Sequence, residues 1–291
     1  MSPLEGHPAE LISSRRNPLI RRLRSLASSS GRQQDGHLLL EGTHQLQELI
    51  ALKEQLLEPV QVFATADWVD SHSALMARLS GFIRLQPMTD VALKAALSTV
   101  NPDGVACLLP LELLPSPEPA PSFVLALDRV QDPGNLGTLL RTALGADVDQ
   151  VWLAAGADPL APKVLRSAVG SVMRLPFIRF GPTDDVGLEQ LALQLRQARD
   201  RGLQVVGTLV PDSAAGFPVV PYWELNWCQP TVLVLGNEGS GLHPMLQACC
   251  SHGVTLPHSP RLESLNVAAA AVPLLLERRR ATMTASTQHS G

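Results

Sequence analysis

The stretch Leu127–Asp147, "LDRVQDPGNLGTLLRTALGAD", changes its hydrophobic period in the middle, and this change decides the fold. The continuous apolar run Phe123–Leu127 leads into it, as is typical of a buried strand. Pro133 and Gly134 then mark a turn, and Leu136–Leu144 follows helical spacing. One apolar stripe of that helix is formed by Leu136, Leu139, Leu140 and Ala143. A strand, a turn and a helix begin a βαβ unit, so the pattern predicts an α/β fold with a parallel sheet.

Downstream of this stretch, strands and helices keep alternating. We expect strands at Val151–Ala154, Gln204–Thr208, Thr231–Leu235 and Val254–Leu256, and helices at Pro162–Ala168, Val186–Asp200 and Leu265–Arg280. Parallel strands all end at one edge of a sheet, and ligands bind in open α/β sheets at that carboxyl edge. Candidate site residues are therefore sought directly after strands.

Upstream, a smaller set of elements predicts a second α/β layer. Strands are expected at His37–Gly42, Val60–Thr65 and Val105–Leu109, and helices at Pro18–Ala27, Thr43–Leu57 and Val91–Leu97. Pro110–Pro121 holds five prolines in twelve residues, which predicts a stiff, extended linker. We expect a smaller first domain over 8–109, the linker over 110–121, a main domain over 122–281 and a disordered tail over 282–291.

Composition limits the class of protein. The chain has 291 residues, 45% of them hydrophobic, so it can bury a sizeable core. Its four cysteines have no C-x-x-C spacing, which predicts reduced thiols and no metal site. The longest apolar run, Val267–Leu276, is too short to span a bilayer. We expect a cytoplasmic protein with no membrane partner.

Polar residues follow two of the expected strands. In the first helix, Asn135, Thr138 and Arg141 share the side opposite the apolar stripe, where they are either solvated or face a ligand. The strand Thr231–Leu235 ends in "GNEGSG", with Glu238 at the apex of a glycine-rich turn. The glycine spacing is G-x-x-G-x-G, which excludes the dinucleotide fingerprint of a nucleotide-binding dehydrogenase.

The third segment is "LPHSPRLESLNVAAAAV", Leu256–Val272. Ser264 either caps the last helix or belongs to a ligand pocket. The alanines permit close approach of the backbone, and the helix is apolar on every side as far as Leu276, which predicts burial all round. Pro273 interrupts its hydrogen-bond ladder.

In this order and spacing, "DPGNLGTLLRTA", "LGNEGSGL" and "LPHSPRLESLNVAAA" resemble the three motifs of the SpoU (TrmH-type) RNA 2′-O-ribose methyltransferases of the SPOUT superfamily. The resemblance covers roughly Ser122 to Arg280, and "PKVLRSAVGSVMRLPF", Pro162–Phe177, also fits. The N-terminal part resembles the ribosomal-protein-L30e-like substrate-binding domain often fused to this family. The resemblance implies a parallel-sheet domain with a trefoil knot, a homodimer, and methyl transfer from S-adenosylmethionine to a ribose 2′-hydroxyl.

The resemblance also implies roles for single residues. The cofactor contacts fall on Thr208, Leu209, Gly236, Leu256 and Leu265. The polar residues of the reaction fall on Asn135, Arg141, Glu238, Ser264 and Asn266. Arg141 is either a general base or a charged clamp for the phosphate and the developing oxyanion. The clamp is physically easier, because a guanidinium is rarely neutral.

Two further features bear on the substrate. Residues 11–34 carry six arginines and no acidic residue, which indicates an RNA-binding surface whose members are Arg15, Arg16, Arg21, Arg22, Arg24 and Arg32. An ordinary solvated helix face is the alternative. Ribosomal RNA, most simply 23S, is favoured over transfer RNA because of the extra N-terminal domain. A catalytically silent RNA-binding relative is disfavoured, because all five polar positions are intact.

Three positions depart from the family pattern. Pro260 stands where the third motif commonly has glycine, and Pro273 lies inside the last helix. His258 stands where an apolar residue is expected and is a candidate ligand contact.

Overall fold

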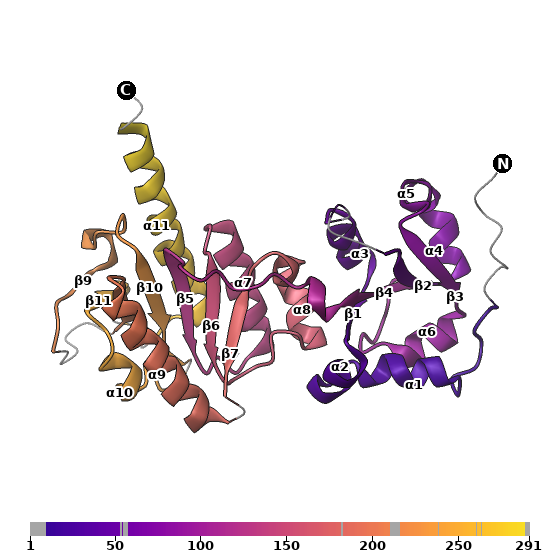
Figure 1. Ribbon diagram of the computed structural model, residues 1–291, viewed down its shortest axis with the longest axis horizontal. Coiled ribbons are helices and arrows are strands. Elements are labelled where there is room, and N and C mark those ends of the chain that lie inside the picture. The colour runs from indigo at the N-terminus through magenta and orange to yellow at the C-terminus, as the bar shows by residue number, and fades with distance from the viewer. Residues whose placement is uncertain are drawn as a thin grey trace. The chain divides into compact units, whose positions relative to one another are not determined.

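The computed structural model describes residues 10–52, 54, 58–181, 183–209, 216–237, 239–259, 261–262 and 264–288. The chain divides into two compact units (Figure 1). The first comprises Met1–Leu114 and Leu160–Gly170, and the second comprises Pro115–Pro159 and Ser171–Gly291. Within the described residues, no helix combines the length and the hydropathy that crossing a bilayer requires.

The second unit is built on one parallel sheet, as its sequence predicts. Its strands are β5 (Phe123–Asp128), β6 (Gln150–Ala154), β7 (Phe177–Phe180), β8 (Gln204–Thr208), β9 (Val219–Pro221), β10 (Thr231–Leu235) and β11 (His252–Thr255). Their order is β7-β6-β5-β10-β8-β11-β9, and every neighbouring pair is parallel. The strands β10, β8 and β11 are therefore adjacent, although β9 and β10 separate β8 from β11 in the chain.

Helices cover both faces of this sheet. They are α7 (Pro133–Gly145), α9 (Asp184–Asp200), α10 (Pro244–Gln247) and α11 (Val267–Gln288). Helices α9 and α10 lie on one face, and α7 and α11 pack against each other on the other (Figure 1). The predicted apolar stripe of α7 is buried throughout. On its opposite side Asn135 is half-buried and Arg141 is exposed. The cap of α7 is Asp132, whose Oδ1 accepts from the Asn135 N–H at 2.8 Å.

Helix α11 differs from its prediction in three ways. It begins at Val267, and its cap is Asn266 instead of Ser264, because Asn266 Oδ1 accepts from Ala268 N at 2.9 Å and Ala269 N at 3.1 Å. It continues to Gln288, through residues for which we expected disorder. It is also not buried all round, since Val272 and Leu276 are exposed.

The first unit is a smaller α/β layer, as expected. Its mixed sheet has the order β1-β4-β2-β3, formed by β1 (His37–Glu41), β2 (Val60–Ala64), β3 (Ile83–Pro87) and β4 (Val105–Pro110). Its helices are α1 (Pro18–Ser25), α2 (Ser29–Asp35), α3 (Thr43–Ile50), α4 (Ala66–Ser71), α5 (Ser73–Leu79), α6 (Asp90–Ala96) and α8 (Pro162–Ala168). Apolar side chains of α1 and α6 pack together over one face of this sheet.

Helix α8 was expected in the main domain, and it packs with the first unit instead. The amide of Gln45 donates to the Leu165 carbonyl at 2.7 Å in a buried position. Arg166 forms an ion pair with Glu41 at 3.4 Å, and donates to Ser98 Oγ at 2.9 Å. The chain therefore passes between the units after Leu114, Pro159 and Gly170, and not only through the proline-rich linker.

Candidate active site

A cavity of about 480 Å³ lies at the carboxyl ends of β8, β10 and β11. The end of each strand contributes lining residues, and the start of α11 closes one side. All five residues expected to contact a cofactor line this cavity: Thr208, Leu209, Gly236, Leu256 and Leu265. They come together because parallel strands end at the same edge of a sheet.

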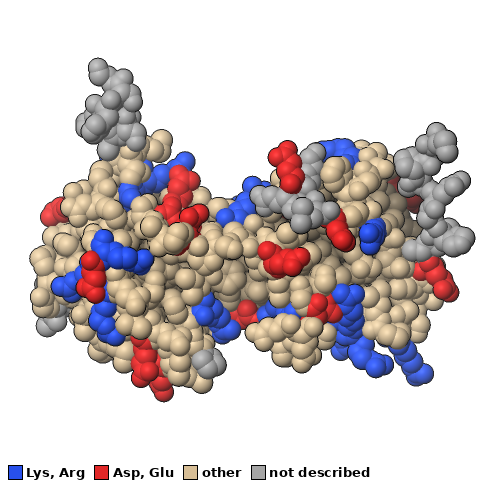
Figure 2. Space-filling model, in the orientation of Figure 1, with Lys and Arg blue, Asp and Glu red and all other residues tan. Residues whose placement is uncertain are grey.

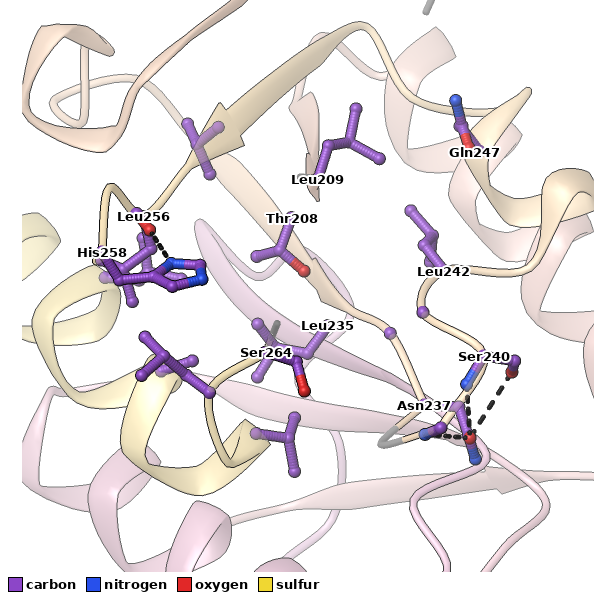
Figure 3. Close-up of a pocket in the computed structure, with 18 residues that line it drawn as sticks. Thr208, Leu209, Leu235, Asn237, Ser240, Leu242, Gln247, Leu256, His258 and Ser264 are labelled. Carbon is purple, nitrogen blue, oxygen red and sulfur yellow. Dashed lines mark hydrogen bonds between the residues drawn. The ribbon is translucent and has the colours of Figure 1, made fainter. Parts of the chain in front are cut away.

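Figure 3 shows how the labelled side chains surround this space. His258 and Ser264 approach from the side of β11 and α11, and Leu242 and Ser240 from the loop after β10. Thr208 lies between them at the end of β8, and its hydroxyl donates to the Val234 carbonyl at 3.2 Å. The polar groups are few and the remaining lining is apolar or main chain, as in most small-molecule sites.

The loop after β10 closes so tightly that Gly236 cannot carry a side chain. A Cβ at Gly236 would lie 2.5 Å from both the carbonyl carbon of Gly241 and the nitrogen of Leu242. These are backbone atoms, which cannot rotate aside. The glycine therefore permits the close approach of two backbone segments, and it leaves main-chain groups at the cavity wall.

Asn237 organises this loop, which the sequence pattern did not reveal. Its backbone exchanges two hydrogen bonds with Gly241, at 2.9 and 3.1 Å. Its side-chain oxygen accepts from Gly239 N at 2.9 Å, and its amide donates to the Arg129 carbonyl at 2.9 Å. An asparagine two residues after the end of a strand, between two glycines in "GNEG", is a usable signal for such a self-bonded turn.

The polar residues from the first and third motifs meet at the edge of the cavity. Asn266 Nδ2 donates to Asn135 Oδ1 at 2.9 Å, although the two residues are 131 positions apart in the chain. Asn266 stands between Leu265 and Val267, which both line the cavity, as does Ser264. The contact therefore joins the start of α7 to the cavity wall.

Arg141 lies further along the same side of α7. The helical rise places it about 9 Å from Asn135 along the axis. Its guanidinium is exposed, and it makes no hydrogen bond or ion pair with any residue that the structure describes. It is thus available to an anionic ligand. Glu238, the remaining polar candidate, lies outside the described residues.

The six arginines of residues 11–34 divide into three groups: four are exposed, Arg22 forms an ion pair, and Arg32 is buried. Arg15, Arg16, Arg21 and Arg24 are exposed, and basic side chains project from the surface formed by α1 (Figure 2). Arg22 donates to Asp35 at 2.6 and 2.9 Å, and this hydrogen bond lowers the pKa of the Asp35 carboxyl.

Arg32 does not belong to this surface, contrary to the expectation from its sequence. Its side chain is buried, and Nη1 donates to the Leu26 carbonyl at 2.9 Å and the Ala27 carbonyl at 3.1 Å. These bonds fix the end of α1 to α2. A buried guanidinium that is already bonded to carbonyls cannot reach a phosphate.

Comparison with known proteins agrees with this arrangement. Residues 122–275 match the SpoU rRNA Methylase family. The chain is 38% identical over 290 residues to the uncharacterized tRNA/rRNA methyltransferase slr1673 of Synechocystis sp., covering 99% of both chains. It is 30% identical over 271 residues to the 23S rRNA (guanosine(2553)-2′-O)-methyltransferase RlmP of Bacillus subtilis, covering 92% of this chain and 98% of the relative.

Solved structures show the same fold. The AdoMet-bound rRNA methyltransferase from Sinorhizobium meliloti superimposes with a TM-score of 0.73 at 26% identity, over 94% of this chain and 98% of that chain. The family match covers more than half of the chain, and the similarity to relatives extends over nearly all of it. This protein belongs to the SpoU rRNA methylase family.

Proposed function

We propose that this protein is an RNA methyltransferase that transfers a methyl group from S-adenosylmethionine to a ribose 2′-hydroxyl. The observation that carries the proposal is the cavity at the ends of β8, β10 and β11, whose edge holds the hydrogen bond between Asn266 and Asn135. A small-molecule site and a set of polar residues for a second substrate are thus adjacent. Methyl transfer needs this arrangement, because donor and acceptor must be held in line.

The cavity fits S-adenosylmethionine. Its volume of about 480 Å³ falls within the range of small-molecule sites, roughly 300–1,000 Å³. Main-chain groups at Gly236, Leu256 and Leu265 would bind the polar atoms of the cofactor, and the apolar side chains would cover its adenine. When bound, the cofactor supplies an electrophilic methyl group on a sulfonium sulfur.

His258 adds one oriented polar group to this cavity. Its Nδ1 lies 2.8 Å from the Leu256 carbonyl, which can only accept, so Nδ1 carries the proton. In the neutral ring Nε2 then keeps its lone pair. His258 therefore offers a hydrogen-bond acceptor to an N–H or O–H group of the ligand.

On the acceptor side, the chain must position a weak nucleophile and stabilise negative charge. In the reaction the ribose oxygen would take the methyl group, the cofactor would leave as a neutral thioether, and the hydroxyl proton would pass to water. Arg141 would bind the RNA phosphate and stabilise the developing oxyanion, because a guanidinium is rarely neutral and that of Arg141 has no partner among the described residues. Asn135, Asn266 and Ser264 would orient the ribose beside the cofactor, and Glu238 is assigned to support them.

Asn266→Ala tests whether the contact between Asn266 and Asn135 serves the reaction. We expect kcat to fall about a hundredfold, because the residues that position the ribose lose their mutual alignment. The lost helix cap costs only about 1 kcal/mol of stability, which leaves the protein folded. Single-turnover methylation and thermal unfolding measure the two effects separately.

Thr89→Ala is the matched control, since Thr89 Oγ1 caps α6 in the first unit by accepting from Ala92 N. It should lower stability by a similar amount and leave kcat unchanged. Equal rates for Asn266→Ala and Thr89→Ala would show that Asn266 is only a cap. In a double-mutant cycle, Asn135→Ala should add little to the effect of Asn266→Ala, because both remove one contact.

Ribosomal RNA is the proposed substrate class, with 23S favoured, because the relative from Bacillus subtilis that aligns over 92% of this chain is named for that RNA. Transfer of tritiated methyl groups to unmodified ribosomal RNA and to transfer RNA tests this. We expect incorporation at a 2′-oxygen of ribosomal RNA. Incorporation into transfer RNA alone would show that the substrate is transfer RNA. No incorporation into either RNA would indicate a catalytically silent RNA-binding relative.

The exposed arginines of the first unit are the proposed contact with RNA phosphates. Arg21 and Arg24 are both exposed and about one helical turn apart on α1, whose buried residues are Ile20 and Leu23. Replacing both by Ala should weaken RNA binding and reduce the slope of log K against log salt by about 0.7 to 0.9 per arginine. Arg78→Ala, an exposed arginine on α5, is the control. An unchanged salt slope in the double variant would remove α1 from the RNA surface.

We further propose a homodimer, a knotted C-terminal segment, an L30e-like first unit and a cytoplasmic location. The exposed apolar residues of α11, Val272, Leu276 and Met283, recur at helical spacing on one side and support an interface between copies. The mass in solution, measured by light scattering, tests the homodimer.

A further inference from the structure

A buried carboxylate at the end of β5 is bonded to one end of the loop after β10, residues 236–243, which is called the glycine-rich loop below. Asp128 is fully buried, yet its two oxygens are both bonded. Oδ1 accepts from Arg129 Nε at 2.7 Å, and Oδ2 accepts from the backbone N–H of His243 at 2.7 Å. A buried charge is tolerated only when it is paired in this way. The hydrogen bond to Asp128 also raises the pKa of the Arg129 guanidinium.

The next residue holds the other end of the same loop. The Arg129 carbonyl accepts from Asn237 Nδ2 at 2.9 Å. Arg129 has a φ of 49°, in the left-handed region that a residue with a side chain rarely adopts. Such a conformation persists only where its surroundings hold it. Two consecutive residues therefore tether the loop at Asn237 and at His243.

The tethered loop is a wall of the cofactor cavity. Gly236, Asn237 and the residues Gly239–Leu242 line it. In the other direction the chain runs from Arg129 to Asp132, which caps the helix that carries Asn135 and Arg141. Asp128 thus contacts the loop that lines the cofactor cavity and lies four residues before the cap of α7, the helix that carries Asn135 and Arg141. It does not itself line the cavity.

We propose that Asp128 is a positioning residue, whose carboxylate holds the glycine-rich loop in its ligand-binding shape before the ligand arrives. The assignment of that ligand as S-adenosylmethionine rests on the proposed function. Two N–H groups point at the Asp128 side chain, so the site requires two acceptors. In Asp128→Asn one acceptor becomes an amide NH₂, and one donor then faces another donor. The shape of the side chain is kept while one of its two hydrogen bonds is lost.

The experiment compares Asp128→Asn with Asp149→Asn in the full chain. Asp149 Oδ2 accepts from Ser122 N, Ser122 Oγ and Phe123 N at 2.6 to 2.9 Å, at the opposite end of β5. Both variants should lower the Tm. Only Asp128→Asn should raise the Kd for S-adenosylmethionine, by about ten- to hundredfold in calorimetry. Its kcat at saturating cofactor should stay within a few-fold of the wild type, so that the effect appears in KM.

Amide hydrogen exchange without cofactor gives an independent result. Asp128→Asn should speed the exchange of the Gly239–Leu242 amides, and Asp149→Asn should not. Asn237→Ala, which removes the bond to the Arg129 carbonyl and the bond from Gly239 N but keeps the carboxylate, should speed the same amides. Equal Kd values and equal loop exchange in Asp128→Asn and Asp149→Asn would overturn the proposal. A wild type that binds no S-adenosylmethionine would overturn the proposed function instead, while the exchange comparison would still decide the role of Asp128.

Discussion

Arg141→Ala is expected to lower the rate of methyl transfer by about 10³-fold and to leave the Kd for S-adenosylmethionine unchanged. The guanidinium is exposed, unpaired within the described residues and on the side of α7 that begins at Asn135, but it does not line the cofactor cavity. Its removal should therefore affect the reacting hydroxyl and the RNA without disturbing the cavity. Single-turnover kinetics and calorimetry on the same preparation measure the two quantities.

The control for this variant is Arg201→Ala, which removes an exposed arginine that donates to the Pro119 carbonyl in the same unit. It should methylate at the wild-type rate. Arg141→Lys keeps the charge but loses the planar fork that binds a phosphate, so an intermediate rate is expected for a clamp. Retained turnover in Arg141→Ala would exclude the roles of base and clamp together.

Gly236→Ala is expected to raise the Kd for S-adenosylmethionine by more than about a hundredfold, which in calorimetry corresponds to about 2.7 kcal/mol or more. The added Cβ would lie 2.5 Å from two backbone atoms of Gly241 and Leu242 and 2.9 Å from the Gly241 carbonyl oxygen. No rotamer change relieves a contact with backbone, so the loop must open and the cavity wall must move.

Gly145→Ala is the matched control, because a Cβ at Gly145, the last residue of α7, meets nothing within 4 Å. This variant should bind the cofactor as the wild type does. Wild-type affinity in Gly236→Ala would show that the loop opens without cost to binding. In that case main-chain contacts at Gly236 would not hold the cofactor.

Five of the seven strands in the second unit, and their alternation with α7, α9 and α11, could be predicted from hydrophobic period, whereas β7, β9 and α10 were not predicted. The apolar strands alternate with amphipathic helices, and this alternation is a local property of the chain. It follows that Thr208, Gly236 and Leu256 share one sheet edge, because each comes at or just after the end of a parallel strand. The first residue of α11 could not be predicted from residue type, since Ser264 and Asn266 are both good caps.

Other features depend on contacts between distant segments. The burial of Arg32, the docking of α8 on Gln45 and the exposed side of α11 at Leu276 are decided by which surfaces pack together. No periodicity separates a buried arginine bonded to carbonyls from an exposed one that is free for phosphate. Periodicity also does not separate an apolar helix side that faces the core from one that faces solvent.

The amino-acid pattern was thus sufficient for the parallel sheet, the cofactor edge and the membership of the SpoU family, because local hydrophobic period and short motifs are written in consecutive residues. Only the folded chain assigned the tethers of the glycine-rich loop. Asp128 and His243 are 115 positions apart, and Arg129 and Asn237 are 108 apart. Hydrogen bonds over such separations depend on distance and direction in space, and these exist only after β5 and β10 have paired.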